Sequence, residues 1–320
     1  MPSFTASAPG KIILFGEHAV VFGEPAIAVP VTNVRAKATI TPDVQGKSGE
    51  VRVVAPGVGL DSRLEDLPAG NPVGEAIRIV LNNLGISTIP PCTLKITSSI
   101  PVASGLGSGA AVSVAIIRAL AGFLGHPFPD EQVSALAFEI EKIHHGTPSG
   151  IDNTVVTYGR PVFFIKGETP VTFPITQPFW LVIGDTGVPA PTRAAVADVR
   201  RGWQAKPARF NQLFAAAGKI TRAARQAIES GHPERLGPLM DENHALLQDM
   251  GVSSPELNGL VEAARAAGAL GAKLSGGGRG GNMIALVPAG AAPVVATALQ
   301  RSGAAGTIIT EVKAHAHPVA

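Results

Sequence analysis

A glycine-rich loop that leads straight into an apolar helical segment constrains the fold of this chain more than any other feature. The loop reads Pro101-Val-Ala-Ser-Gly-Leu-Gly-Ser-Gly-Ala-Ala111, and mostly apolar residues continue from there to Leu124. The first N–H groups of a helix lack intrahelical partners and lie at the positive end of its dipole, so this junction predicts an anion site. Gly105, Gly107 and Gly109 let the backbone approach a ligand closely and adopt positive φ. We expect a nucleotide phosphate as the ligand.

The loop differs from a Walker A motif because no lysine follows its last glycine. A phosphate-binding lysine must therefore come from another part of the chain. A second glycine loop, with Gly276, Gly278 and Gly281, matches G-x-G-x-x-G, but the residues that follow it predict a strand where a dinucleotide-binding fold needs a helix. This loop is either a hairpin without a ligand or a segment packed against the phosphate site. Arg279 within it faces either phosphate or solvent.

Composition limits the classes of function. The chain has 320 residues, of which 45% are hydrophobic and 16% charged, which fits one large or two ordinary domains. A net charge of +2 without a dense Lys/Arg run predicts no nucleic-acid partner. The single Cys92 excludes an internal disulfide and a cysteine-based zinc site. No signal peptide or bilayer-spanning segment is predicted, since the most apolar stretch is short and carries Arg118. We expect a cytoplasmic enzyme.

The first half of the chain alternates strand-like segments with helices. Asn71 and Pro72 predict the start of a helix that runs to Leu84, with Asn71 as N-cap. A second helix is predicted from Asp130 to His145, with Gly146 as its terminator. Extended segments are predicted at residues 11–15, 26–41, 51–55, 93–97, 151–157 and 161–165.

The second half combines strands and longer helices. Ser254 predicts a helix N-cap with Pro255 at the first helical position. Strands are expected at residues 180–184, 272–275, 282–287 and 306–312, and further helices at 208–230, 234–249 and 291–302. This order predicts an α+β unit with helices on one face of an antiparallel sheet. A boundary near residues 174–178 divides the chain into domains 1–175 and 176–320.

Several polar residues suit phosphoryl transfer, which needs a cation at the phosphates, Mg²⁺ on their oxygens and a carboxylate facing the acceptor hydroxyl. Lys11, Glu141, Asp152 and the pair Glu17-His18 are the candidates. Each also has an ordinary interpretation: an exposed lysine, a solvated helix face, or an Asp that bonds to its own turn. His144 and His145 lack the i, i+4 spacing of helical metal ligands, so they are not expected to bind metal.

Taken together, the segments resemble the GHMP kinase superfamily. Its three motifs occur in order, as Pro9-Gly-Lys-Ile-Ile-Leu-Phe-Gly-Glu-His-Ala-Val-Val21, the 101–111 loop, and Lys273-Leu-Ser-Gly-Gly-Gly-Arg-Gly-Gly281. Residues 145–153 and 183–192 are similar to the branch of this superfamily that phosphorylates mevalonate. The resemblance implies an α+β fold of two domains, an N-terminal α/β sandwich-like domain and a C-terminal ferredoxin-like domain. It also implies transfer of phosphate from ATP to the 5-hydroxyl of (R)-mevalonate in isoprenoid biosynthesis, with Mg²⁺ as cofactor.

The resemblance also implies roles for individual residues. Asp152 would face the acceptor hydroxyl, Lys11 would stabilise the developing negative charge, and Glu141 would bind Mg²⁺. The phosphates would lie on Pro101, Ser104, Gly105, Leu106, Gly107, Ser108, Gly109, Ala110, Gly277 and Gly278. The acceptor pocket would be lined by Glu17, His18, Ser149, Gly150 and Thr192. Arg193 and Lys166 are equal candidates for binding the substrate carboxylate.

One position departs from the family pattern. The family usually has two adjacent serines in the second motif, and the second helps to hold Mg²⁺, whereas this chain has Ser108 followed by Gly109. Either Ser108 turns to the metal, or water takes the place, or the metal binds more weakly. The alternatives to a kinase for mevalonate are a kinase for phosphomevalonate, homoserine, a sugar or the 3-hydroxyl of mevalonate, and a non-catalytic ligand sensor. A homodimer is possible, and neither nucleic acid nor a membrane is an expected partner.

Overall fold

The protein consists of two compact units that are interleaved along the chain. The computed structural model describes residues 2–101, 104–145, 148–189 and 192–314. The first unit comprises Met1–Gly10, Val34–Val102 and Leu106–Gly159, and the second comprises Lys11–Asn33, Ala103–Gly105 and Arg160–Ala320. Strands β1 (Phe4–Phe15) and β2 (Ala26–Pro42) therefore contribute residues to both units. The domain boundary expected after residue 175 stays a prediction.

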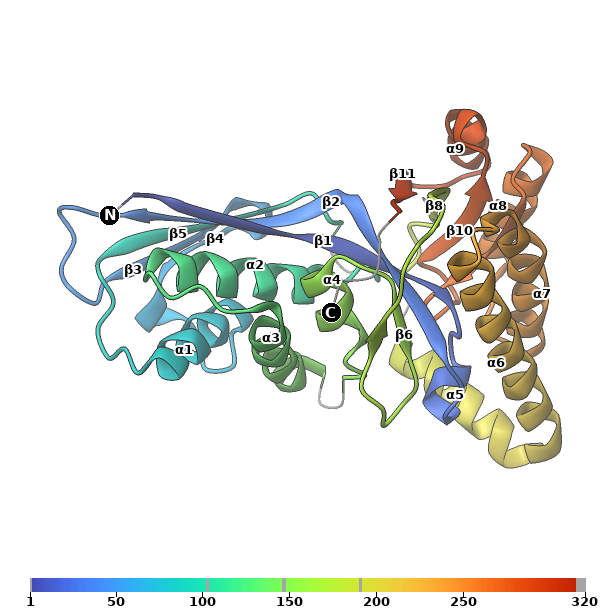
Figure 1. Cartoon of the computed structure of the whole chain (residues 1–320), viewed down its shortest axis with the longest axis horizontal. Coiled ribbons are helices and arrows are strands. Elements are labelled where there is room, and N and C mark those ends of the chain that lie inside the picture. Colours follow the sequence, from blue (N-terminus) through green and yellow to red (C-terminus); the bar gives the residue numbers. More distant parts are fainter. Residues whose placement is uncertain (1, 102–103, 146–147, 190–191, 315–320) are drawn as a thin grey trace. The chain divides into compact units, whose positions relative to one another are not determined.

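The first unit is a sheet covered by helices. Strands β4, β3, β5 and β2 lie in this order, and β1 also pairs with β2. Strands β3 and β5 are parallel, whereas β4 and β3, and β5 and β2, are antiparallel. The helices α1, α2 and α3 lie along one side of this sheet (Figure 1). The bounds are β3 Val51–Ala55, β4 Leu60–Arg63, β5 Cys92–Ser98, α1 Pro72–Leu84, α2 Ser108–Phe123, α3 Asp130–His145 and α4 Ile151–Tyr158.

Local sequence signals explain where α1 begins and ends. The Asn71 side chain accepts hydrogen bonds from the N–H groups of Val73 and Gly74, and Gly85 ends the helix with φ 66°. Both residues perform the capping roles that their types favour. The predicted helix of residues 72–84 is therefore confirmed. Gly146, the predicted terminator of α3, lies outside the described residues.

The prediction of an extended segment at residues 151–157 is wrong, because these residues form α4. The segment is rich in Val and Thr, and such β-branched residues favour strands when considered alone. Tertiary packing overrides that preference here. Asn153 Nδ2 donates to both the backbone oxygen and the hydroxyl of Ser134 on α3, and residues 153–157 are all buried. The side-chain anchor and the buried face hold the helix in place.

The second unit is built on a four-stranded antiparallel sheet with the order β11-β8-β10-β9. Numbered along the chain, this is the order 4-1-3-2 of a ferredoxin-like βαββαβ fold, as the family resemblance implied. Helices α6, α7 and α8 stand together on one side of the sheet (Figure 1). The bounds are β6 Val162–Phe164, β7 Val171–Thr172, β8 Phe179–Asp185, α5 Thr192–Ala205, α6 Pro207–Glu229, α7 Leu236–Asp249, α8 Pro255–Ala266, β9 Gly271–Ser275, β10 Asn282–Val287, α9 Ala292–Arg301 and β11 Gly306–Val312.

Helix α5 was not predicted. Among its residues only Ala195 and Val199 are buried, so the apolar stripe that would reveal the helix is one residue wide. The helix starts at Thr192, so this predicted acceptor-site residue lies at a helix terminus.

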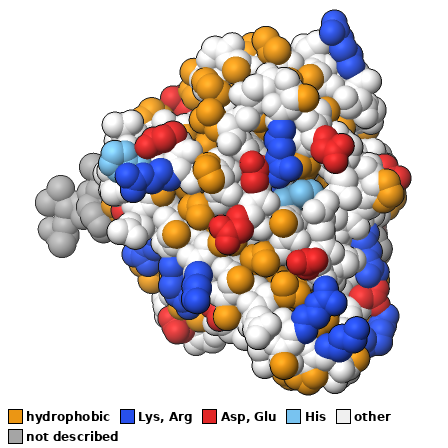
Figure 2. Space-filling view, turned by 90° about the vertical axis from the view of Figure 1, so that its right-hand side faces the viewer, with side chains coloured by type: hydrophobic (Ala, Val, Ile, Leu, Met, Phe, Trp, Pro, Cys, Tyr) orange, Lys and Arg blue, Asp and Glu red, His pale blue; other side chains and the backbone are white. Residues whose placement is uncertain are grey.

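The described surface includes a face on which charged and apolar side chains are mixed (Figure 2). On the face shown in Figure 2, acidic and basic side chains are interspersed with apolar ones. Within the described ranges, no helix combines the length and apolar character that crossing a bilayer requires.

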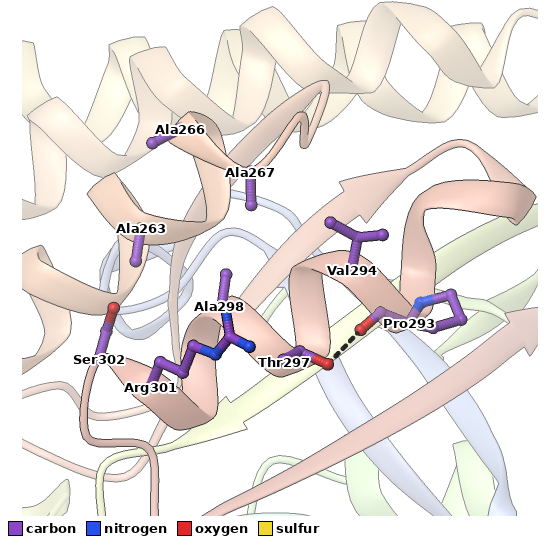
Figure 3. Close-up of a pocket in the computed structure, with 9 residues that line it drawn as sticks. All are labelled: Ala263, Ala266, Ala267, Pro293, Val294, Thr297, Ala298, Arg301 and Ser302. Atoms are coloured by element: carbon purple, nitrogen blue, oxygen red, sulfur yellow. Dashed lines mark hydrogen bonds between the residues drawn. The ribbon is translucent and has the colours of Figure 1, made fainter.

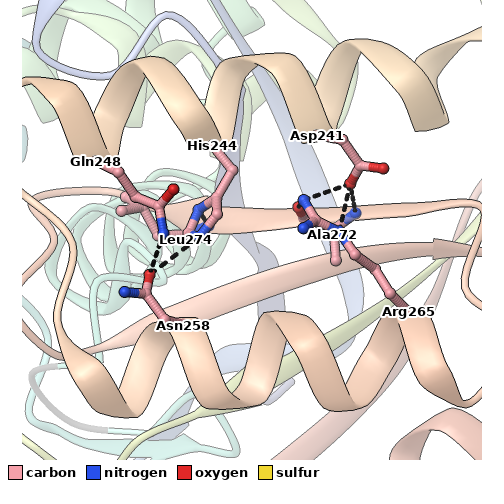
Figure 4. Close-up of polar contacts among 7 residues, drawn as sticks. All are labelled: Asp241, His244, Gln248, Asn258, Arg265, Ala272 and Leu274. Carbon is pink, nitrogen blue, oxygen red and sulfur yellow. Dashed lines mark hydrogen bonds and ion pairs between the residues drawn. The ribbon is translucent and has the colours of Figure 1, made fainter.

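Side chains from α7 and α8 cap the edge strand β9. Asp241 accepts from the N–H of Ala272 (2.9 Å), and Arg265 donates to the oxygen of Ala272 (3.0 Å). His244 Nδ1 accepts from the N–H of Leu274 (3.3 Å), and its Nε2 lies 3.1 Å from Asn258 Oδ1 (Figure 4). An exposed strand edge is a template for unwanted pairing. These hydrogen bonds give partners to backbone groups at the edge of β9, and they hold in place the strand that leads into the second glycine loop.

We expect the free energy of unfolding to decrease as the pH falls from about 6.5 to about 4. Burial lowers the pKa of His244 from 6.5 to about 4, with smaller contributions from the positive charges of Lys273 and Arg265. Between these values the unfolded chain binds more protons than the folded one, so acidification favours unfolding. Burial also lowers the pKa of His18 to about 4, so His18 likewise makes the free energy of unfolding decrease on acidification.

Chemical denaturation at several pH values, in the wild type and in His244→Asn, measures this dependence. The asparagine Oδ1, bonded to Cγ as Nδ1 is, offers the Leu274 N–H an acceptor that does not titrate. The variant should therefore show a shallower pH dependence, with the His18 contribution retained. Identical slopes in the two proteins would contradict the role given to His244.

Candidate active site

The structure divides the predicted site residues between its two units. The first unit contains Pro101, Leu106, Gly107, Ser108, Gly109, Ala110, Glu141, Ser149, Gly150 and Asp152. The second contains Lys11, Glu17, His18, Ser104, Gly105, Thr192, Gly277 and Gly278. The convergence of the two groups on one substrate stays a prediction.

The first glycine loop ends in an uncapped helix terminus. Gly107 is the N-cap of α2 with φ 71°, and no side chain in the described part of the chain caps it. Leu106 is 1% exposed and anchors the loop in the core, while Gly105 has φ 75°. A left-handed glycine before an uncapped first turn directs N–H groups outward, which is the geometry of an anion site.

Glu141 faces this helix terminus. Its side chain is on α3 and 6% exposed, and a Cβ placed on Gly109 would lie 3.5 Å from its Oε1. The described residues contain no group of three or more His, Cys, Asp and Glu suited to a metal. Mg²⁺ is commonly held by one or two carboxylates together with phosphate oxygens and water, so a single carboxylate beside a phosphate loop fits that ion.

Asp152 lies in the first turn of α4, and not in a loop that enters a strand as the sequence predicted. Gly150 precedes it with φ 86°, and Thr154 Oγ1 donates to the Gly150 oxygen (2.7 Å). The Ser149 hydroxyl accepts from the N–H of Ile151 (3.3 Å). The backbone is therefore fixed on both sides of Asp152, whose half-buried carboxylate is held on a rigid element and not on a loop tip.

His18 is held in a defined tautomer by the second glycine loop. Its Nε2 lies 3.0 Å from the oxygen of Gly277, and the ring is buried. Burial lowers the pKa of His18 to about 4, so the ring is neutral near pH 7. Because a carbonyl oxygen only accepts, Nε2 carries the proton and Nδ1 is an acceptor. No described residue pairs with Nδ1.

Glu17 forms a buried ion pair that the sequence analysis missed. Its partner is Lys273 on β9, whose side chain is 0% exposed. Lys273 Nζ also donates to the oxygen of Leu274 (2.6 Å) and lies 5.9 Å from the ring centroid of Phe15. Desolvation lowers the pKa of Lys273, and Glu17 opposes that shift. A lysine within the otherwise apolar stretch of β9 was the available signal, but its partner lies 256 residues away.

The second glycine loop packs closely against its surroundings. A Cβ on Gly277 would lie 2.7 Å from Thr192 Oγ1, and one on Gly278 would lie 2.0 Å from the oxygen of Val252. Ser104 is bound through its backbone oxygen by Asn282, the first residue of β10. The second unit thus brings His18, Gly277 and Thr192 together, with Lys11 buried on β1 in the same unit.

The cations that the sequence offered for the substrate carboxylate have different surroundings. Lys166 Nζ donates to the oxygen of Val21 (3.4 Å), and Arg193 is exposed in the first turn of α5. The sequence left open whether Arg279 faces phosphate or solvent. In the structure it forms an ion pair with Asp198 on α5, and its side chain is 39% exposed.

A groove between α8 and α9 is lined by residues of a different kind. Small and apolar side chains line most of it, Arg301 is the one charged residue among the described ones that line it, and Thr297 Oγ1 donates to the Pro293 oxygen (Figure 3). None of the predicted site residues lines it. The groove therefore offers no chemistry for phosphoryl transfer.

Comparisons with known proteins identify the family of this chain. Residues 71–160 match the family model for the GHMP kinases N terminal domain, and residues 224–305 match that for GHMP kinases C terminal. The mevalonate kinase of Pyrococcus furiosus is 38% identical, over 96% of this chain and 95% of its own. The crystal structure of L. major mevalonate kinase in complex with R-mevalonate is 33% identical with a TM-score of 0.83, over 98% of this chain and 96% of its own. The chain therefore belongs to the mevalonate kinase family of the GHMP kinases.

Proposed function

We propose that this chain transfers the γ-phosphate of ATP to the 5-hydroxyl of (R)-mevalonate and releases ADP and 5-phosphomevalonate. The observation that carries the proposal is the similarity, over nearly the whole chain, to a mevalonate kinase solved with R-mevalonate. Three features supply chemistry that such a reaction needs. They are the uncapped start of α2, the Asp152 carboxylate on α4, and the two buried neighbours Glu17 and His18.

The phosphate end of the site combines backbone donors with a lysine. The N–H groups at the start of α2 would bind the phosphates of ATP, and Gly277 and Gly278 would border them. Lys11 would stabilise the negative charge that develops during transfer. When bound, Mg²⁺ would neutralise phosphate oxygens, held by Glu141 and Ser108.

Asp152 would act on the acceptor alcohol. Its carboxylate would accept a hydrogen bond from the 5-hydroxyl, orient the oxygen and take its proton as the new P–O bond forms. The bond between the γ-phosphorus and the bridging oxygen of ADP breaks in the same displacement, and the proton then passes to solvent. Glu17 and His18 would line the acceptor pocket. Because Nδ1 of neutral His18 is an acceptor, the pocket suits a substrate that carries hydroxyl groups.

We expect Gly109→Ser to increase Mg²⁺ affinity. The space is available, since a Cβ there makes an ordinary contact of 3.5 Å with Glu141 Oε1, and a serine would add a hydroxyl beside that carboxylate. An added neutral ligand worth about 1 kcal/mol corresponds to an affinity increase of about fivefold. Calorimetry measures ATP binding at increasing Mg²⁺ concentrations and gives the Mg²⁺ concentration for half-maximal binding. If this concentration is the same in the variant and the wild type, residue 109 does not face the metal.

Ser108→Ala is the companion variant in the same titration. If Ser108 binds the metal in the wild type, its loss should weaken Mg²⁺ binding. An unchanged Mg²⁺ titration would remove Ser108 from the metal site and leave Glu141 as the protein ligand there.

A coupled assay of ADP release tests the proposed substrate. Mevalonate, phosphomevalonate, homoserine and galactose are compared as acceptors at equal concentrations, with ATP and Mg²⁺ present. The proposal predicts that mevalonate has the highest kcat/KM. Preference for another acceptor would assign the chain to a different GHMP kinase activity, and nucleotide binding without turnover of any acceptor would favour a ligand sensor. The similar phosphomevalonate kinase and galactokinase structures are 20% identical or less, so they support the fold alone.

Location and assembly are also part of the proposal. We expect a cytoplasmic enzyme whose partners are mevalonate, ATP and Mg²⁺, and a homodimer remains a prediction. The absence of a dense basic run in the sequence argues against a nucleic-acid partner.

A further inference from the structure

Arg279 occupies a backbone position that favours glycine. Among the described residues, only His18 (φ 59°) and Arg279 (φ 62°) combine a side chain with positive φ. The residues around Arg279 in its loop, Gly278, Gly280 and Gly281, all adopt positive φ. An L residue has a conformational cost in this region that glycine avoids. Such positions cluster at functional sites, so the presence of a long cation here points to a use for its side chain.

Both positions belong to the same local structure. The imidazole of His18 is hydrogen-bonded to the oxygen of Gly277, two residues before Arg279. Gly277 packs against Thr192, and the N–H of Gly281 donates to the oxygen of Val188 (2.9 Å). The loop therefore lies against the segments that the proposed function assigns to the acceptor pocket. The positive charge of Arg279 also contributes, after burial, to the low pKa of His18, which indicates that its field reaches that ring.

The guanidinium of Arg279 belongs to a cluster with excess positive charge. It pairs with Asp198 on α5, and the same carboxylate pairs with Arg201, one turn further along the helix. Two guanidinium groups share one carboxylate, so the cluster keeps one net positive charge. With its side chain 39% exposed, Arg279 remains accessible to an anion from solution. Lys273, whose charge also lowers the pKa of His18, is fully buried and paired with Glu17.

We propose that Arg279 is a specificity-determining residue that binds the carboxylate of the acceptor substrate. A guanidinium matches a carboxylate with two parallel hydrogen bonds, which both binds and orients it. The backbone of Arg279 is held by its N–H bond to the oxygen of Val252 (2.8 Å), so the side chain extends from a fixed point. This inference rests on the proposed function, because it assumes that the acceptor is a hydroxy acid.

Arg279→Gly is the direct test, because glycine suits the positive φ and the variant is expected to fold. We expect the KM for mevalonate to rise by about tenfold, which corresponds to the loss of one charge-assisted pair, while kcat and the KM for ATP stay within about twofold. As a second arm, the triol in which the carboxylate of mevalonate is reduced to an alcohol is measured as a competitive inhibitor. Its inhibition constant should be the same in the wild type and the variant, since the triol has no carboxylate to lose.

Asp198→Asn separates substrate binding from a structural role. If Arg279 binds the carboxylate, removing the charge of Asp198 frees the guanidinium, and the KM for mevalonate should stay the same or fall. If Arg279 only ties the loop to α5, Asp198→Asn should reproduce the defect of Arg279→Gly, and this result would overturn the inference. Arg201→Gln, which removes the other partner of Asp198, is the matched control for the loss of a surface arginine.

Two further outcomes are decisive. A rise in the KM for ATP, with the KM for mevalonate unchanged, would assign Arg279 to the phosphates and refute carboxylate binding. Failure of the wild-type protein to phosphorylate mevalonate at all would refute the proposed function itself. That failure is distinguishable, because the inference about Arg279 is judged only on differences between the variant and an active wild type.

Discussion

Asp152→Asn is expected to lower kcat by about 10²- to 10⁴-fold, the range that one positioned general base contributes. The amide has the same shape as the carboxylate, but it neither takes the proton of the acceptor hydroxyl nor carries the charge that orients it. The backbone around residue 152 is held by Gly150, Thr154 and Ser149, so the exchange should leave α4 in place. ATP affinity should change by less than about twofold, since the phosphates are assigned to other residues.

Steady-state kinetics and calorimetric ATP binding on the same preparations measure this effect. Glu139→Gln is a matched control, because Glu139 is an exposed acid on α3 that pairs with Lys142 (2.7 Å) and has no proposed role. It should retain normal turnover. Near-normal kcat in Asp152→Asn would remove that residue from the chemistry, and a parallel loss of ATP binding would indicate a structural defect.

Lys273→Met is expected to destabilise the fold by about 3–5 kcal/mol, the cost observed when one partner of a buried ion pair is removed. The methionine fills most of the volume, but it leaves the Glu17 carboxylate buried without its cation. The oxygen of Leu274 on the edge strand also loses a donor. Since Lys273 and Glu17 are 0% and 1% exposed at their side chains, water does not replace the missing charge unless the structure opens.

Denaturant unfolding, monitored by fluorescence and circular dichroism, gives the free energy of unfolding. The double variant Lys273→Met/Glu17→Gln should recover a substantial part of the loss, because it removes the uncompensated charge. Arg52→Met provides the comparison with an exposed pair, since Arg52 and Asp61 are bonded on the surface, and it should have little effect. If Lys273→Met and Arg52→Met lowered the free energy of unfolding equally, the buried pair would not stabilise the fold more than an exposed one.

The parts of the fold that sequence reasoning predicted well depend on local signals. Asn71 and Pro72 mark the start of α1 by their own conformational preferences. The strands of the second sheet follow from short apolar runs, and the order of strands and helices along the chain predicted an α+β unit with an antiparallel sheet. The family resemblance supplied the ferredoxin-like topology. Helix α4 was misassigned because its β-branched residues favour a strand until packing against α2 and α3 is considered.

For the candidate site, the sequence predicted the residues but not their interaction partners. Motif order led to the candidate residues, because glycine loops and single polar residues can be read from the chain. Partners could not be read in the same way. The bonds between Lys273 and Glu17, between Arg279 and Asp198, and between His18 and Gly277 join residues distant in sequence. Such pairs are set by the fold, and no local propensity reveals them.

Phosphorus NMR of the product formed from ATP and (R)-mevalonate shows which hydroxyl receives the phosphate. We expect stoichiometric formation of ADP and one new phosphomonoester resonance, split by the two protons on carbon 5 of the acceptor. An unsplit phosphomonoester, as expected for transfer to the tertiary 3-hydroxyl, would contradict the assigned regiochemistry. A spectrum in which ATP persists beside unmodified mevalonate would contradict the proposed activity altogether.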